Sequence, residues 1–291
     1  MSKAPDMAAA DGAHAHGIKA IKFSRDWITR PVFGVALALA VMAAIYGGTT
    51  YLALVVAVVV FAAAREWHRM VKHGKIGIEL AITTATIWLA LAAYVFWPKS
   101  FAPAIILVCG ALLTYALTAA RKSDPVWHAG GVLYLGVPAL AILMVRDLPR
   151  DGAWLVVGLF IAVWATDTGA LIAGNLLGGP KLAPVLSPNK TWAGFFGGVI
   201  AAAILEAVFV ALIGGNLFVA AMFGAVLAVF AHLGDLFESW VKRHFHTKDS
   251  GGLIPGHGGA LDRIDSTLAA VLALAIAVFV FHLDPLFGAH P

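Results

Sequence analysis

The sequence predicts an all-α protein, a polytopic bundle of helices embedded in a membrane. Its mean hydropathy is +0.88, and charged residues make up 12% of the chain, whereas they account for roughly a quarter of an average soluble domain. Apolar runs recur along nearly the whole 291-residue sequence. The alternating pattern of apolar and polar residues that marks the strands of a membrane barrel is absent. These observations favour membrane-spanning helices.

The apolar runs give the number of spans to expect. A hydrocarbon core of about 30 Å requires roughly 20 apolar residues in a helix. Nine stretches approach that length, although the second and the fifth are short. They are residues 32–48, 49–64, 78–97, 101–119, 130–146, 153–175, 193–213, 216–234 and 266–283. We therefore expect about nine transmembrane helices.

The distribution of lysine and arginine predicts how these spans are oriented. With the N-terminus inside, the inside segments hold 17 of the 20 Lys and Arg residues, and the outside segments hold only Lys99, Arg146 and Arg150. This bias predicts an inside N-terminus and an outside C-terminus. It also explains the isoelectric point near 9.2, so we expect no nucleic-acid partner. The inside segments are residues 1–31, 65–77, 120–129, 176–192 and 235–265.

The first polar feature is Asp167, which lies near the middle of an apolar span. A carboxylate surrounded by hydrocarbon is costly, so we expect Asp167 to face the protein interior or a water-filled cavity. The alternative is a structural carboxyl group that is hydrogen-bonded to neighbouring helices.

A segment rich in glycine and proline, residues 178–194, follows that span. Its Ser187-Pro188-Asn189-Lys190 stretch suggests a rigid turn that leads into a helix. The start of a helix offers free backbone N–H groups to an anion, and Lys190 would add positive charge. The alternative is a surface loop in which the lysine reaches the membrane interface. The glycines are not followed by the Gly-Lys-Ser/Thr of a Walker A loop.

The most charged segment, residues 235–265, lies between the last two apolar spans. Asp262 and Asp265 are three residues apart, so a helix beginning there would present both on about one face, near its N-terminus. Asp235 closes the preceding span, and a glycine-rich return would bring it to the same membrane face. Such carboxylates suit Mg²⁺, which also takes phosphate oxygens. The alternative is a solvated loop with surface ion pairs.

Cationic side chains accompany these acids. Lysine and arginine bind phosphate, and glycines allow the backbone to approach a phosphorylated ligand. We expect Ser187 to be a hydrogen-bond donor, whereas His257 remains open between a base, a phosphate donor and a structural donor in a glycine turn. The phosphate contacts that we expect are Lys190, Lys242, Arg243, Lys248 and Arg263.

The charged segment resembles the phosphatidate cytidylyltransferase family. The resemblance rests on many residue types at fixed spacing and covers about residues 160–270. Two upstream segments are also similar to the family, Asp167-Thr168-Gly169-Ala170 and Ser187-Pro188-x-Lys190-Thr191. The main pattern is Ser239-x-x-Lys242-Arg243, then Lys248-Asp249, then Pro255-x-His257-Gly258-Gly259-x-x-Asp262-Arg263-x-Asp265.

The resemblance implies an integral membrane enzyme that converts CTP and phosphatidate into CDP-diacylglycerol and pyrophosphate, the first committed step of phospholipid synthesis from phosphatidate. It implies Mg²⁺ bound by Asp235 and Asp262, with room for a monovalent cation such as K⁺. The catalytic residues that it implies are Asp167, Lys190, Asp235, Lys248, Asp249, His257, Asp262, Arg263 and Asp265. The implied substrate and phosphate contacts are Ser187, Asn189, Lys190, Ser239, Lys242, Arg243, Lys248 and Arg263.

This interpretation divides the chain into three parts. Residues 1–31 are expected to be a disordered and interfacial amphipathic N-terminus, residues 32–150 the N-terminal transmembrane helices, and residues 151–291 the C-terminal catalytic helices with cytoplasmic motif loops. We expect a multi-pass protein of the bacterial inner membrane, with membrane lipids around it and the active site facing the cytoplasm. A homodimer is compatible with the sequence, but nothing in the sequence demonstrates one.

Two other functions compete with this one. A secondary transporter would use Asp167 and Glu206 as ion relays, but it would have little use for the charged segment around Asp262. A lipid kinase that uses CTP would release CDP instead of pyrophosphate. The nucleotide product therefore separates the two enzymatic alternatives.

Overall fold

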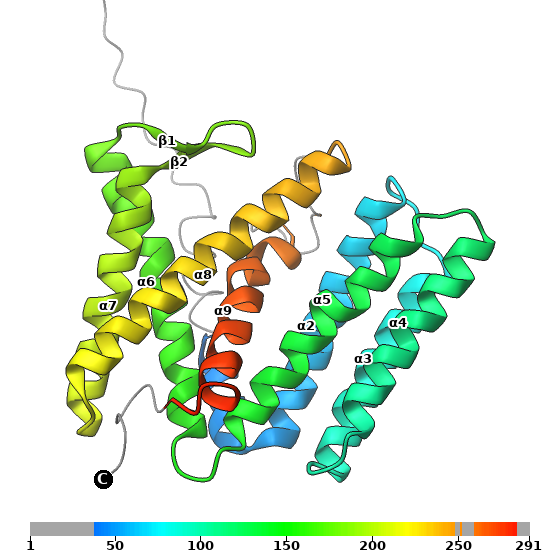
Figure 1. Ribbon diagram of the computed structural model, residues 1–291, viewed down its shortest axis with the longest axis horizontal. Coiled ribbons are helices and arrows are strands. Elements are labelled where there is room, and N and C mark those ends of the chain that lie inside the picture. The colour runs from blue at the N-terminus through cyan, green and yellow to red at the C-terminus, as the bar shows by residue number, and fades with distance from the viewer. Residues whose placement is uncertain (1–37, 248–250, 252–258, 284–291) are drawn as a thin grey trace, which may run out of the picture.

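The computed structural model describes residues 38–247, 251 and 259–283, and within these ranges the protein is a bundle of helices with one two-stranded sheet (Figure 1). A short apolar helix at Ala38–Gly47 comes first. The elements that follow are α2 (Thr49–Val71), α3 (Ile78–Phe96), α4 (Ala102–Ala120), α5 (Pro125–Arg146), α6 (Gly152–Leu177), β1 (Lys181–Ala183), β2 (Ser187–Thr191), α7 (Trp192–Ile213), α8 (Leu217–His244) and α9 (Leu261–Phe279).

The all-helical membrane class is confirmed, since seven of the described helices, α2 to α8, are long and apolar enough to cross a membrane. Two of the nine expected spans differ. The described helix at Ala38–Gly47 is shorter than a span, and α9 carries Asp262, Arg263 and Asp265 in its first turns. The count of nine therefore stays a prediction.

Many large apolar side chains lie on the outside of the bundle. Examples on α4 and α7 are Leu112, which is 64% exposed, and Leu212, which is 82% exposed. A soluble protein rarely exposes so much contiguous apolar surface, whereas hydrocarbon chains of a bilayer solvate it. The helices satisfy their own backbone hydrogen bonds, as a membrane interior requires.

Local sequence signals fix the helix ends that surround the site. Thr191 is the N-cap of α7, and its hydroxyl oxygen accepts a hydrogen bond from the Gly194 N–H at 3.1 Å. The Asn216 side chain caps α8 in the same way, because its Oδ1 accepts from the N–H groups of Phe218 and Val219. Such side chains satisfy donors that have no partner inside the helix.

Successive helices run up and down, so their connections alternate between the two ends of the bundle. The hairpin of β1 and β2 lies at the same end as the C-terminal end of α8 and the start of α9 (Figure 1). The links from α2 to α3 and from α4 to α5 also lie at this end. This agrees with the grouping of the lysine- and arginine-rich segments on one face, while the side of a membrane that this face occupies remains a prediction.

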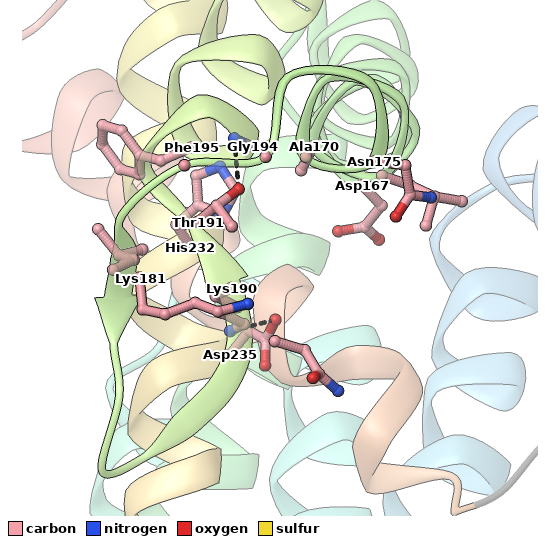
Figure 2. Close-up of a pocket in the computed structure, with 16 residues that line it drawn as sticks. Asp167, Ala170, Asn175, Lys181, Lys190, Thr191, Gly194, Phe195, His232 and Asp235 are labelled. Carbon is pink, nitrogen blue, oxygen red and sulfur yellow. Dashed lines mark hydrogen bonds and ion pairs between the residues drawn. The ribbon is translucent and has the colours of Figure 1, made fainter.

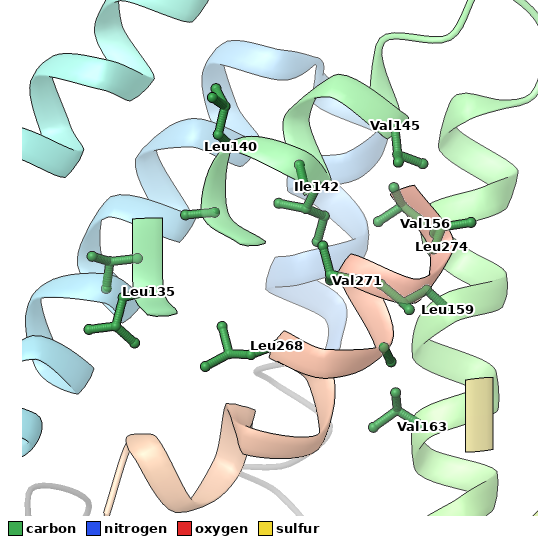
Figure 3. Close-up of a cluster of buried hydrophobic side chains, with 14 of the residues drawn as sticks. Leu135, Leu140, Ile142, Val145, Val156, Leu159, Val163, Leu268, Val271 and Leu274 are labelled. Carbon is green, nitrogen blue, oxygen red and sulfur yellow. The ribbon is translucent and has the colours of Figure 1, made fainter. Parts of the chain in front are cut away.

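A core of aliphatic side chains joins the two halves of the chain. Helix α5 packs against α9 and α6, and Figure 3 shows Ile142 of α5, Val271 of α9 and Leu159 of α6 within one apolar cluster. Each of these side chains is less than a tenth exposed. The N-terminal helices therefore support α9, which carries part of the charged segment.

Two expectations about the polar segments need correction. Asp235 does not close its span, because α8 continues to His244, and the polar residues after Asp235 belong to the helix. At 1.5 Å per residue, its 28 residues extend about 42 Å, which exceeds a hydrocarbon core of about 30 Å. Residues 178–194 were expected to form a turn that leads into a helix; the helix α7 does begin at Trp192, but two short strands precede it. The polar run of residues 187–191 has no strand pattern, and pairing with β1 creates the strand.

Candidate functional site

A cavity of about 650 Å³ opens between α6, the hairpin, the start of α7 and the middle of α8 (Figure 2). This volume lies within the range of roughly 300–1,000 Å³ that small-molecule sites occupy. Its lining is unusually polar for an apolar chain. The polar and charged side chains that line it include Asp167, Asn175, Lys181, Asn189, Lys190, Thr191, His232 and Asp235.

The centre of one wall is an ion pair between the hairpin and α8. The Lys190 Nζ lies 2.5 Å from an Asp235 carboxylate oxygen, and the two side chains are 21% and 37% exposed. Figure 2 shows Asp167 projecting from α6 on the other side of the open space. The structure therefore brings together three side chains predicted for the site, from segments 68 residues apart at the widest.

The hairpin owes its position to its glycines and to its pairing. Gly178 and Gly179 have φ values of +61° and +95°, a region that glycine adopts without the strain a side chain would cause. Lys181 then pairs with Thr191 across the antiparallel strands, and the Trp192 N–H donates to the Pro180 carbonyl oxygen at 3.0 Å. These contacts place Lys190 beside α8.

An acidic group lies next to the cavity where α8 and α9 meet. Carboxylate oxygens of Asp235, Glu238 and Asp265 all lie within 4.8 Å of one another, and this is the one such group of three potential ligands among the described residues. Glu238 and Asp265 are 1% and 6% exposed. Close approach of the two helices depends on Gly234, because a Cβ there would collide with the Asp265 carbonyl oxygen.

Asp262 lies beside this group and has different contacts. One of its oxygens accepts a hydrogen bond from Lys242 Nζ at 2.9 Å, and the other accepts from the Gly259 N–H at 3.2 Å. Lys242 also lies 2.6 Å from Glu238. Lys242 thus bridges Glu238 of α8 and Asp262 of α9. The assignment of Asp262 as a metal ligand stays a prediction.

The remaining predicted residues lie in several surroundings. Asn189 lines the cavity, Ser187 is half-buried in β2, Ser239 is buried in α8, and Arg263 is exposed on α9. The Arg243 Nε donates to the Leu186 carbonyl oxygen at 3.4 Å, which ties the end of α8 to the hairpin. Lys248, Asp249 and His257 lie outside the described residues.

Sequence reasoning missed Glu238 and Lys181 as site residues. Glu238 follows Asp235 by three positions, so the two share a face once α8 is known to continue. Because we expected the helix to end at Asp235, we did not place Glu238 on the same helical face. Lys181 carried no signal of its own, because its place in the cavity depends on the hairpin.

The donor set of the acidic group fits a hard divalent cation. Three carboxylates within 4.8 Å concentrate negative charge in a partly buried place, and oxygen ligands of this kind are those that Mg²⁺ prefers. Lys190 pairs with Asp235 and Lys242 pairs with Glu238, which offsets part of the negative charge of the group.

The sequence matches the model of the cytidylyltransferase family over residues 28–281. The chain belongs to this family. The match extends from before α2 to the end of α9, so it includes every described residue of the site. Membership makes the chain a nucleotidyltransferase.

Several curated members are similar to this chain. A phosphatidate cytidylyltransferase of Brucella suis is 41% identical over 215 residues, which cover 70% of this chain and 78% of the relative. One of Staphylococcus haemolyticus is 40% identical over 170 residues, covering 57% and 64%. One of Staphylococcus epidermidis is 42% identical over 147 residues, covering 50% and 55%. The relatives are bacterial, and the apolar helices make this chain a membrane-embedded protein.

Proposed function

We propose that this chain is a phosphatidate cytidylyltransferase, which converts CTP and phosphatidate into CDP-diacylglycerol and pyrophosphate. The names of the similar bacterial proteins support the substrates. The observation that carries the proposal is the double role of Asp235, which lines the cavity and also belongs to the acidic group. A nucleotide in the cavity would therefore lie next to the cation-binding carboxylates.

The reaction needs alignment more than it needs a base. A phosphate oxygen of phosphatidate attacks the α-phosphorus of CTP and forms a new P–O bond. The bond from that phosphorus to the bridging oxygen breaks, and pyrophosphate leaves with the electron pair. Because the attacking phosphate is already anionic, the protein has mainly to hold two anions together in line.

Cationic and backbone donors of the cavity suit the triphosphate. Lys190 and Lys181 come from the two strands of the hairpin, and the start of α7 directs N–H groups towards an anion. Lys190 stabilises negative charge as it develops on the departing pyrophosphate. Asn189 offers a further hydrogen bond, and Asp167 shapes the opposite, polar wall. Ser187, Ser239, Arg243 and Arg263 remain proposed contacts of phosphate or headgroup.

We propose Asp235, Glu238 and Asp265 as the carboxylates that hold Mg²⁺, with Asp262 joining them by resemblance. When bound, the ion would screen the repulsion between the two phosphates and offset charge on the leaving group. Lys242 holds the carboxylates of Glu238 and Asp262 in place. A monovalent cation such as K⁺ beside Mg²⁺ belongs to the same proposal.

The lipid substrate explains why the enzyme is built in a membrane. Both acyl chains of phosphatidate can stay in the bilayer while the phosphate reaches the polar end of the bundle. We propose that this end faces the cytoplasm of a bacterial inner membrane, where CTP is present, in keeping with the positive-inside rule. A homodimer and the catalytic roles of Lys248, Asp249 and His257 remain proposals of the same kind.

The decisive test uses purified protein with radiolabelled CTP, phosphatidate and Mg²⁺. We expect CDP-lipid and pyrophosphate in equal amounts, and we expect neither in the Asp235→Asn variant. Release of CDP with a phosphorylated lipid would instead indicate a kinase. If no cytidine-containing lipid forms with any phosphatidate tried, the proposed function is wrong.

A further inference from the structure

A buried acid of the N-terminal helices contacts the charged segment directly. Glu66 lies near the end of α2, and its side chain is 0% exposed. A carboxylate removed from water in an apolar protein is costly unless hydrogen bonds compensate it. The groups that contact the Glu66 carboxylate therefore indicate its role in the structure.

One partner is the first residue of α9. The Leu261 N–H donates to Glu66 Oε2 at 2.8 Å, across 195 residues of sequence. Negative charge is favourable at this end of a helix, where backbone N–H groups lack partners inside the helix. Leu261 directly precedes Asp262, and Asp265 follows one turn later. The contact thus fixes the turn that carries both acids.

A second contact involves Gly251, which lies on the other side of the intervening segment. A Cβ built on Gly251 would lie 2.5 Å from Glu66 Oε1 and 2.7 Å from Glu66 Cδ. Glycine therefore allows the backbone to press against the carboxyl group. Residues 251 and 261 meet at one side chain of α2, although they are ten positions apart.

The neighbours of Glu66 hold it rigidly. The Trp67 Nε1–H donates to the Trp127 carbonyl oxygen at 2.9 Å, and His68 Nδ1 lies 2.8 Å from His128 Nδ1. Trp67 and His68 are 1% and 0% exposed. Because the two residues that directly follow Glu66 fasten α2 to α5, Glu66 is a fixed reference point for α9.

We propose that Glu66 is a positioning residue for cytidylyl transfer, acting through the Leu261 N–H to orient Asp262 and Asp265. The inference rests on the proposed function, and it gives the N-terminal helices a part in the reaction. Glu66 lies outside the cavity lining among the described residues, so it acts on the acids and not on the nucleotide.

The test compares Glu66→Ala and Glu66→Gln with matched changes at Glu79. Glu79 is also a buried acid of the N-terminal helices, 2% exposed, but it pairs with Lys72 at 2.6 Å. Hydrogen–deuterium exchange of peptides covering residues 259–266 measures the contact without any activity assay. The Mg²⁺ concentration for half-maximal rate and the KM for CTP measure its consequence.

In Glu66→Ala we expect amide exchange at the start of α9 to rise about tenfold. The half-saturating Mg²⁺ concentration should rise about tenfold as well, as is typical when the support of a metal ligand is lost. The KM for CTP should change less than about twofold, because the cavity is built by other elements. Glu66→Gln keeps an acceptor oxygen and should give intermediate values, about threefold in both.

The Glu79 variants should leave both quantities at wild-type values. Equal increases in the Glu66 and Glu79 variants would indicate general loosening and overturn the proposal, as would unchanged exchange in Glu66→Ala. If the alanine variant does not fold, the glutamine variant decides by the same measurements. If wild-type protein makes no CDP-lipid, the proposed function fails, and the exchange experiment alone decides whether Glu66 holds α9.

Discussion

Two lysine–acid pairs illustrate the difference between the N-terminal helices, α2 to α5, and the C-terminal unit of α6 to α9 with its hairpin. Lys72 and Glu79 lie 2.6 Å apart, and the acid is 2% exposed. Lys190 and Asp235 lie 2.5 Å apart, and the acid is 37% exposed. The distances are nearly equal, so the accessibility of the acid distinguishes the two pairs. The Glu79 carboxyl group is enclosed although Lys72 is 28% exposed, whereas Lys190 and Asp235 line a cavity that a ligand can enter.

The same contrast holds for the other polar side chains of the two regions. Among the N-terminal helices, His68 contacts His128 at 2.8 Å and Thr83 at 2.9 Å. These groups satisfy one another within the protein, as buried polar groups must. In the C-terminal unit, Asp167 and Asp235 line an open cavity. Polar groups that are enclosed by partners stabilise the fold or, as we propose for Glu66, position other residues, whereas those that line a cavity are accessible to a ligand.

The largest effect is expected at Asp235. Replacement by asparagine removes a charge from both the cavity and the acidic group, so turnover should fall about a thousandfold or more. The protein should still insert and fold, because the side chain is partly exposed. Radiolabelled product formation and the melting temperature in detergent measure the two effects. Activity within tenfold of wild type would contradict the functional role of the exposed pair.

The acids of α9 decide between two cation-binding sets. The resemblance assigns Asp262, whereas the geometry groups Asp265 with Asp235 and Glu238. We expect Asp262→Asn and Asp265→Asn each to lower turnover at least about a hundredfold in folded protein. The Mg²⁺ dependence of the residual rate identifies direct ligands. Near-normal rates in Asp262→Asn would remove it from the metal site.

Lys190→Ala should lower kcat/KM for CTP about a hundredfold, because the cation that we propose as a contact of the triphosphate is lost. Lys190→Arg is the matched control, since it keeps the charge but changes its geometry, and it should recover part of the loss. The KM for phosphatidate should move less than the KM for CTP. A larger change in the KM for phosphatidate than in the KM for CTP would place this lysine at the attacking phosphate and not at the nucleotide.

Much of the fold and part of the candidate site could be predicted from the sequence. Apolar runs located α2 to α8, because bilayer thickness fixes the length of a span. The three-residue spacing of Asp262 and Asp265 correctly indicated a helix start, whereas the site residues named from the motifs stay predictions. Asp167, Lys190 and Asp235 all line one cavity. The motif spacings are local in the sequence, and the lengths of the apolar runs are fixed by the thickness of the bilayer.

The missed features depend on contacts between distant segments. The contact from Glu66 to Leu261 spans 195 residues, and no pattern around Glu66 reveals it. The hairpin forms because Gly178 and Gly179 turn the chain and α8 lies beside it, although its sequence has no strand alternation. Glu238 was missed because polar residues that follow an apolar run are typical of a loop. In the structure these residues belong to α8, which packs against α9.

Loss of the Lys72–Glu79 pair should lower stability and leave turnover nearly unchanged, whereas loss of the Lys190–Asp235 pair should lower turnover and leave the fold intact. Glu79→Gln leaves Lys72 without its buried partner, so the free energy of unfolding should fall by about 1–3 kcal/mol. Turnover should stay within about threefold of wild type at temperatures where the protein is folded. Thermal unfolding with parallel activity assays tests this. A hundredfold loss of activity with unchanged stability would show that the N-terminal pair takes part in the reaction.

The smallest effect is expected at Lys99, which lies in the connection between α3 and α4, at the end of the bundle opposite the hairpin (Figure 1). The residue is exposed, so Lys99→Ala should alter stability by less than about 0.5 kcal/mol. Activity should remain within about twofold, because the side chain is separated from the cavity by the length of the helices. Kinetics with both substrates provide the measurement. A tenfold loss of turnover in folded protein would mean that the two ends of the bundle do not divide the chemistry as we propose.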